Sequence, residues 1–265
     1  MPAGKRLHKI VEVLAKRCEA DGKKSELTEL RDPFVLGAWL ILGQHAKRNG
    51  QARAYEALRR AKGTSPGMLL DLAADKLALI CQMAGPYEDA RAKDLYAYAD
   101  SIEEKCGQDF GRVFKKPLAE ARKFLETDLR KPHAFADFLL LYGGGFPVFP
   151  VETRVARVVT RLGLAKAKSE KELDDKTYRA LQKALESQGP RSAEWLTRAH
   201  GLLYQHGTDT CHATAPACER CPLAGECLYV KKHPPPKPAG AGVYSHAGRD
   251  VAVQAARSSR SSRPV

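Results

Sequence analysis

Four cysteines in the C-terminal part of the chain constrain its fold more than any other feature. Cys211, Cys218, Cys221 and Cys227 follow one another as C-x6-C-x2-C-x5-C. Four thiolates that converge from one compact loop suit a cubane iron-sulfur cluster, whereas structural zinc sites usually present two close pairs separated by a longer segment. The spacing therefore predicts the ligands of a 4Fe-4S cluster, with a structural zinc site as the alternative.

The composition and charge of the chain indicate a globular protein with an anionic partner. Hydrophobic residues make up 43% of its 265 residues, and the formal net charge is +13. A basic excess of this size attracts phosphates, so nucleic acid is the first candidate partner and an anionic membrane the second. No apolar run approaches the ~20 residues of a membrane-spanning helix, and the start MPAGKRLHKI lacks the hydrophobic stretch of a signal peptide. We therefore expect a cytoplasmic protein with reduced thiols and no membrane partner.

The pattern of apolar residues up to residue 205 predicts an all-α protein. Leu7, Ile10, Val11 and Leu14 recur at the spacing of an amphipathic helix, and strand-like alternation is scarce. A second helix is expected to start at 33 and to continue past residue 44 towards a break near 49–50. Further helices are expected at 51–61, 66–73, 75–82, 88–105, 118–125, 135–142, 152–162, 170–187 and 191–205. The three glycines at 143–145 are expected to form a turn, because a phosphate-binding loop also needs a strand and a lysine.

Residues 231–265 have a different composition. They contain PPPKP and end in ARSSRSSRPV, with seven Lys or Arg residues and one Asp. A segment so poor in apolar residues buries too little surface to fold. We predict a disordered basic tail, which either binds DNA phosphate weakly or is a solvated tail of little consequence.

The cysteine segment resembles the C-terminal cluster loop of a known family. HGTDTCHATAPACERCPLAGECLYVKK is similar to that loop in the endonuclease III family of DNA repair glycosylases, including His-Gly before the first cysteine and Cys-Pro-Leu at the third. Weaker similarity extends over most of residues 30–230. The resemblance implies a 4Fe-4S cluster bound by the four cysteines and a DNA partner.

The resemblance also implies a domain organisation. It predicts a barrel-like domain of six helices at 33–146, which contains a degenerate helix-hairpin-helix. A second helical domain, which holds the iron-sulfur cluster, is expected to combine residues 1–32 with 147–230. The cleft between the two domains would bind DNA.

A catalytic carboxylate is implied by the same resemblance. The family motif V-D-T-H aligns with residues 151–154, which places Glu152 where the family has its catalytic aspartate. A carboxylate there can stabilise the positive charge that develops on the sugar and can accept a proton from the attacking water. Glutamate keeps the charge but is one methylene longer, and a displacement of ~1 Å can cost on the order of a hundredfold in rate. The alternative is a glutamate that only stabilises the start of a helix.

The helix-hairpin-helix of the family's lyase members, L-P-G-V-G-R-K-T-A, aligns with residues 128–136. Ala134 stands in place of the lysine that forms a Schiff base, and Arg130 and Pro132 stand in place of the two glycines. Alanine has no amine with which to form an imine. Proline has no N–H for a phosphate, and a residue with a β-carbon resists the positive φ of such a turn. We therefore expect weak or absent lyase activity.

Side-chain charge can replace part of the lost phosphate binding. Arg130, Lys131 and His133 are candidate DNA contacts in the turn, and Arg154 and Arg157 are candidates farther along the chain. Lys131 reaching the sugar itself is a weaker alternative. The arm between the first two cysteines has no permanent positive charge, so these residues, the N-terminal basic residues or the tail must supply it.

Gln44 aligns with a glutamine that the family pushes into the DNA duplex. A planar amide at that point could fill the gap left by a flipped base and hydrogen-bond to the orphaned partner base. The alternative is an ordinary glutamine on a helix surface.

Together these features predict a DNA repair protein that acts as a monofunctional N-glycosylase in base excision repair. It would hydrolyse the glycosidic bond through Glu152 without Schiff-base chemistry. The expected partner is damaged double-stranded DNA, and the expected form is a nucleoid-associated monomer. The main alternative is a catalytically weak or silent paralogue that binds damaged DNA, and a zinc-stabilised nucleic-acid module is a weaker one.

Overall fold

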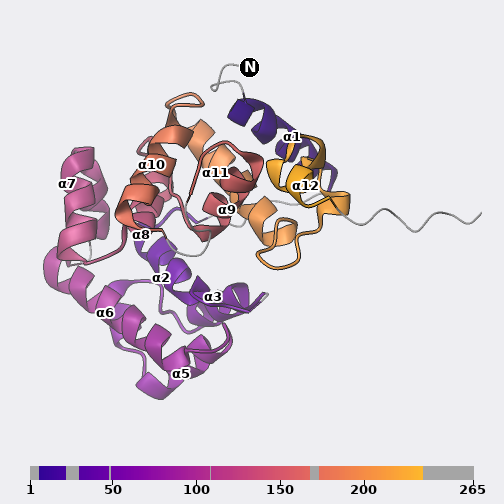
Figure 1. Ribbon diagram of the computed structural model, residues 1–265. Coiled ribbons are helices and arrows are strands. Elements are labelled where there is room, and N and C mark those ends of the chain that lie inside the picture. Colours follow the sequence, from indigo (N-terminus) through magenta and orange to yellow (C-terminus); the bar gives the residue numbers. More distant parts are fainter. Residues whose placement is uncertain (1–5, 22–29, 48, 108, 168–172, 235–265) are drawn as a thin grey trace, which may run out of the picture. The chain divides into compact units, whose positions relative to one another are not determined.

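The described part of the chain consists of helices joined by short connections (Figure 1). The computed structural model describes residues 6–21, 30–47, 49–107, 109–167 and 173–234. None of these residues lies in a β-strand. The all-α prediction is therefore confirmed.

The helices before residue 130 follow one another at short intervals. In chain order they are α1 (Arg6–Ala20), α2 (Pro33–Gly43), α3 (Gly50–Arg60), α4 (Pro66–Leu70), α5 (Ala74–Gln82), α6 (Glu88–Cys106), the 3-10 helix η3 (Phe110–Lys115) and α7 (Leu118–Lys123). Helix α7 continues directly into the π-helical turn η4 (Phe124–Asp128). The sequence predicted these helices except η3.

The helices after residue 130 carry most of the candidate site. They are α8 (His133–Phe138), the π-helical turn η5 (Leu139–Gly143), α9 (Thr153–Leu162), α10 (Asp175–Glu186), α11 (Ala193–Asp209), the 3-10 helices η6 (Cys218–Arg220) and η7 (Ala224–Glu226), and α12 (Leu228–Lys232). Gly145 has a φ of 67°, and the three glycines form the predicted turn at the end of η5. The sequence did not predict η6, η7 and α12.

Helix α2 ends earlier than its apolar pattern predicts. It begins as expected, with Asp32 as the cap of the first turn and Pro33 at the first helical position. It stops at Gly43 because Gln44 has an extended backbone and His45 adopts the left-handed region with a φ of 52°. The predicted continuation past Gln44 was therefore wrong, because apolar periodicity does not report the backbone turn that ends this helix.

Helices that are far apart in the sequence pack together around the core. Helix α1 packs against α11, and α9 packs against both α11 and α12. Helix α2 contacts α3, α6 and η5. Leu7 and Ile10 of α1 and Leu203 of α11 are among the fully buried residues. The first helix is thus held by the C-terminal part of the chain.

Residues up to Pro234 form one unit by their contacts. Within it, the division into a six-helix domain and a cluster domain, and the DNA cleft between them, remain predictions. Helix α12 extends to Lys232, so helical structure continues past residue 230, where the tail was predicted to begin. Residues 235–265 of that tail lie outside the described residues. No described helix combines the length and apolar character needed to cross a membrane.

Candidate functional site

Glu152 lies at the start of α9, where its side chain caps the helix. One carboxylate oxygen accepts a hydrogen bond from the backbone N–H of Arg154 at 2.7 Å, and the other accepts one from Val155 at 3.0 Å. Burial raises the pKa of this half-buried carboxyl, while the Arg154 guanidinium and the two amides act in the opposite direction. The helix N-terminus thus fixes the carboxylate, and each oxygen keeps a lone pair for a further donor.

Tyr142 and His200 form an uncharged pair, and the charge of Glu152 acts on Tyr142. The hydroxyl of Tyr142, in η5, is 2.7 Å from Nδ1 of His200, in α11, and both residues are buried. Burial raises the pKa of Tyr142, and the negative charge of Glu152 adds to this effect. Burial lowers the pKa of His200 to about 3, so its ring is uncharged at neutral pH. The pair therefore adds no charge to the surroundings of Glu152 at neutral pH.

Arg154 lies against an aromatic ring next to Glu152. Its guanidinium carbon is 5.0 Å from the ring centroid of Tyr204, and Nη1 donates a hydrogen bond to the Tyr204 hydroxyl at 3.3 Å. Stacking on an aromatic face orients a guanidinium while leaving some of its five N–H donors for other partners. The structure thus brings this predicted DNA contact and the predicted catalytic carboxylate together.

The segment aligned with the helix-hairpin-helix forms a turn between η4 and α8. The exposed Arg130 has a φ of 50°, although it stands where the family has glycine. The backbone N–H of Lys131 donates to the Leu125 carbonyl at 3.0 Å and so closes the turn. Arg130 thus adopts the positive φ despite its β-carbon, because the surrounding turn determines the backbone and outweighs the strain of a left-handed residue.

Lys131 and Ala134 of this turn have different surroundings. The Nζ of Lys131 is 5.3 Å from the ring centroid of Tyr98 and 5.4 Å from that of Phe135. Burial lowers the pKa of this amine. Ala134 packs partly buried against the hydrophobic core. Lys131 is thus a partly desolvated amine over two aromatic rings, unlike a freely solvated phosphate contact.

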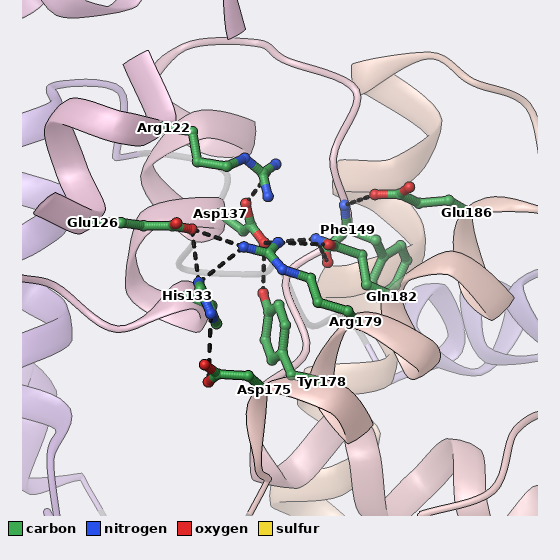
Figure 2. A network of polar contacts seen from close by, with 10 residues as sticks. All are labelled: Arg122, Glu126, His133, Asp137, Phe149, Asp175, Tyr178, Arg179, Gln182 and Glu186. Atoms are coloured by element: carbon green, nitrogen blue, oxygen red, sulfur yellow. Dashed lines mark hydrogen bonds and ion pairs between the residues drawn. The ribbon is translucent and has the colours of Figure 1, made fainter. Parts of the chain in front are cut away.

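His133 belongs to a polar network that links the turn to α10 (Figure 2). Its Nδ1 is 2.8 Å from Oε1 of Glu126 and 2.9 Å from Nη2 of Arg179. Its Nε2 is 3.4 Å from Oδ1 of Asp175. A DNA phosphate that binds this predicted contact would therefore compete with two carboxylates of the protein itself.

Gln44 is exposed directly after α2, and its backbone is held by a buried arginine that the sequence did not reveal. Arg91 of α6 is 2% exposed and donates two hydrogen bonds to the Gln44 carbonyl, at 3.0 and 3.1 Å. It also donates to the carbonyls of Cys81 and Gly85, both at 3.1 Å, and to that of Pro86. One guanidinium thus joins the end of α2 to the loop between α5 and α6 and fixes the position from which the Gln44 side chain projects.

Arg91→Met is expected to lower the free energy of unfolding by about 2 to 4 kcal/mol, because it leaves several carbonyls around a buried site without donors. Urea unfolding measures the change. Arg53→Met is the matched control, since Arg53 is exposed and makes one long hydrogen bond, at 3.4 Å, to the Met83 carbonyl. The control is expected to change stability by less than ~0.5 kcal/mol, and equal effects of the two substitutions would contradict the role of Arg91.

The four cysteines of the predicted cluster loop line one cavity, together with residues of α9, α11 and α12. None of them forms a disulfide bond. The Sγ of Cys221 is 3.7 Å from Nε2 of His206, and the Sγ of Cys227 is 3.4 Å from the Arg161 carbonyl. The structure therefore brings all four predicted ligands to a common space.

Two buried arginines of α9 hold this loop in place. Arg157 donates to the carbonyls of Gly207 and Cys211, both at 2.8 Å. Arg161 donates to two further loop carbonyls at 2.7 and 3.0 Å, and its Nη1 is 3.6 Å from the Sγ of Cys211. Arg157 therefore anchors the loop. The prediction that Arg157 contacts DNA was wrong, because its side chain is buried against these carbonyls.

The thiols that line the cavity have raised pKa values. Burial raises the pKa of Cys211 and Cys218, and raises that of Cys221 to about 11, so these thiols need positive charge to ionise. The guanidinium of Arg161 supplies part of it at Cys211. Among the described residues, no group of three or more His, Cys, Asp or Glu side chains gathers closely enough to hold a single metal ion.

Comparison with solved structures identifies the fold. A trapped covalent intermediate of endonuclease III with DNA aligns with a TM-score of 0.65 over 86% of this chain and 98% of that chain, at 20% identity. A thermostable thymine-DNA glycosylase gives a TM-score of 0.64 with the same coverage, at 16% identity. A 3-methyladenine DNA glycosylase of H. pylori gives 0.56 over 76% of this chain and 97% of that chain, at 18% identity. The described helices therefore have the fold of these glycosylases.

Comparison of sequences identifies the family. No family model matches the chain. Endonuclease III of Rickettsia conorii is 26% identical over 227 residues, which cover 84% of this chain and 95% of the relative. Endonuclease III of Treponema pallidum is 33% identical over 197 residues, which cover 74% of this chain and 84% of the relative. This similarity, extending far beyond the cysteine loop that first indicated it, shows that the chain belongs to the endonuclease III family.

Proposed function

We propose that the protein recognises damaged double-stranded DNA and removes a base from it as a monofunctional N-glycosylase in base excision repair. The observation that carries the proposal is the position of Glu152, a half-buried carboxylate held at the N-terminus of α9 next to Arg154. Membership of the endonuclease III family and the fold of DNA glycosylases support it.

In the proposed reaction Glu152 supplies the negative charge. Breaking an N-glycosidic bond leaves positive charge on the sugar, and a nearby carboxylate stabilises that charge and accepts a proton from the attacking water. Burial raises the pKa of Glu152, which makes its ionised form a stronger base. The hydrogen bonds from two backbone amides hold the carboxylate in one orientation.

The proposed DNA contacts differ in how ready they are to bind. Gln44 is exposed on a backbone that Arg91 holds rigidly, as a residue inserted into a duplex requires. Arg130 is exposed in the turn before α8, and Arg154 lies stacked on an aromatic ring. Lys131 and His133 bind other side chains of the protein, and these contacts must break before either residue binds phosphate.

The four cysteines are proposed to hold a 4Fe-4S cluster, which when bound would tie four points of the loop together. The four thiols around one cavity, three half-buried and one buried, and the adjacent Arg161 support this assignment. A structural zinc ion is the alternative. Iron and sulfide analysis of gently purified protein, together with its brown colour, would support the cluster, and a colourless protein with zinc and no iron would refute it.

No borohydride-trapped adduct with abasic DNA is expected, because Ala134 has no amine to form a Schiff base. Ala134→Lys is expected to create such an adduct, since it restores an amine in the first turn of α8. The measurement is the shift of the protein band on a denaturing gel after borohydride treatment. A strong adduct in the unmodified protein that Lys131→Ala abolishes would contradict the prediction and assign lyase chemistry to Lys131.

A panel of DNA lesions tests the proposed function as a whole. Duplexes that carry one oxidised, alkylated or deaminated base are assayed for base release under single-turnover conditions. Binding is measured at two salt concentrations, so that the contribution of phosphate contacts is visible. Release from at least one duplex supports the glycosylase. Tight binding without release from any duplex favours the damage-binding paralogue. The replaced lysine and the altered hairpin also favour that alternative.

A further inference from the structure

Asp137 of α8 is a fully buried carboxylate surrounded by donors from α7 and α10 (Figure 2). Its Oδ2 accepts hydrogen bonds from the Tyr178 hydroxyl at 2.7 Å, from Gln182 Nε2 at 2.6 Å and from Arg179 Nη1 at 3.4 Å. Its Oδ1 forms an ion pair with Arg122 Nη2 at 2.8 Å, without the alignment of a hydrogen bond. A buried carboxylate is costly unless hydrogen-bond donors or cations surround it. Here these donors come from α7 and α10 and hold both helices to α8.

One of these donors also holds the segment that leads into Glu152. Gln182 Nε2 donates a second hydrogen bond, at 3.0 Å, to the carbonyl of Phe149. The N–H of Phe149 donates to Oε1 of Glu186, one turn farther along α10, at 2.9 Å. Figure 2 shows both side chains of α10 reaching this residue. Both backbone polar groups of Phe149 are thus fixed by α10.

A second donor acts on the residue directly before Glu152. Burial raises the pKa of the Tyr178 hydroxyl, and the nearby backbone of Val151 acts in the opposite direction. The same hydroxyl donates to Asp137, so its orientation is set by that carboxylate. Asp137 is therefore connected through Gln182 to Phe149, and through Tyr178 to the backbone of Val151, which are the two residues that flank Pro150.

We propose that Asp137 is a positioning residue for Glu152: it orients the α10 side chains that hold residues 149–151, and so sets where the carboxylate stands relative to DNA. The proposal rests on the function proposed for Glu152. Displacing a reacting group by ~1 Å can cost on the order of a hundredfold in rate, so a device that fixes this segment affects the chemical step more than it affects DNA binding.

The role requires a carboxylate because every partner of Asp137 is a donor. Asparagine has the same shape, but one of its two positions is an NH2 group. Whichever way the amide is turned, that NH2 faces either the guanidinium of Arg122 or the donors of Tyr178 and Gln182. Asp137→Asn therefore disturbs the network while leaving the volume of the side chain unchanged.

The test compares Asp137→Asn with the unmodified protein and with Asp71→Asn, which changes an exposed carboxylate at the end of α4. Single-turnover base release by Asp137→Asn is expected to be about 10- to 100-fold slower. Its affinity for a duplex with a tetrahydrofuran abasic-site analogue is expected to change less than about twofold. Hydrogen exchange of the Phe149 amide, followed by mass spectrometry, is expected to be faster in Asp137→Asn and unchanged in the control.

The outcomes separate this proposal from the proposed function. If the unmodified protein releases no base, the proposed function fails, and hydrogen exchange at Phe149 still decides whether Asp137 holds the segment. Unchanged exchange and an unchanged release rate in Asp137→Asn would overturn the positioning role, as would a loss of DNA affinity as large as the loss of rate. If Asp137→Asn does not fold, Tyr178→Phe is tested instead, because it removes the hydroxyl that binds Asp137 near the backbone of Val151. Slower release at unchanged affinity would support the role, and an unchanged rate would overturn it.

Discussion

Glu152→Gln is expected to abolish base release while leaving a folded protein that binds DNA. The amide has the size of the carboxylate, and its oxygen can still accept a hydrogen bond from the first turn of α9. It carries no negative charge, however, and cannot accept the proton of the attacking water. We expect the single-turnover rate to fall by a factor of about 100 to 10,000, measured on the duplex that the unmodified protein processes best.

The same substitution is expected to change stability little at neutral pH, because two effects oppose each other. Because burial raises the pKa of Glu152, the folded state holds its proton more tightly than the unfolded state does. The resulting stabilisation is present below the unfolded pKa and is lost as the pH rises through the folded pKa. The ionised carboxylate therefore opposes folding at pH 7, and glutamine avoids that cost. Against this, the NH2 group of glutamine faces one of the two backbone N–H groups that Glu152 caps, so one hydrogen bond is lost. Glu152→Ala also loses the helix cap, so its free energy of unfolding is expected to be ~1 kcal/mol below that of Glu152→Gln.

The pH dependence of base release gives a second measure of the role of Glu152. A general base acts when it is ionised, so the rate is expected to fall as the pH decreases through the folded pKa of Glu152. Burial raises this pKa, so the fall begins at a higher pH than for an exposed glutamate. A Glu152→Gln variant that keeps its rate within about threefold of the unmodified protein would show that Glu152 is only a helix cap.

The sequence features that reappear at the expected places in the structure are those whose signals are local. The four cysteines lie in one short segment, so a single loop brings them to one cavity. Glu152 follows Pro150 at a predicted helix start, and it caps α9 there, because capping depends on a few adjacent residues. Local patterns of this kind survive in the fold because no distant part of the chain is needed to form them.

The residues that hold this site in place could not be predicted, because their partners are distant in the sequence and some of those partners are backbone carbonyls. Arg91 binds the carbonyl of Gln44, which is 47 residues away in the chain, and a carbonyl is the same at every residue. Asp137 gives one signal, since it is the charged residue within the apolar run 135–142. A charge on a buried helix indicates a polar network, but the sequence does not say that Tyr178 and Gln182 complete it.

Cys221→Ser is expected to lose the bound cluster and to lower the free energy of unfolding by more than ~3 kcal/mol. The loop has little packing of its own to replace a metal group. Between residues 211 and 227 the structure shows only Leu223 and Cys227 as buried, and the helices within the loop, η6 and η7, are single turns. Thermal unfolding and iron content of the purified variant measure the two effects.

The matched control is Cys18→Ser, because Cys18 is also a half-buried cysteine outside any disulfide bond but lies in α1, away from the loop. Serine keeps a polar hydrogen at either position and differs mainly in its weak affinity for iron, so only the loop variant is expected to lose iron and colour. If both variants kept the full iron content, Cys221 would not be a ligand. If the unmodified protein contained zinc and no iron, the cysteine loop would be a structural zinc site. Cys221→Ser would still lose stability in that case, because thiolates stabilise either metal group, but only iron gives the visible absorption.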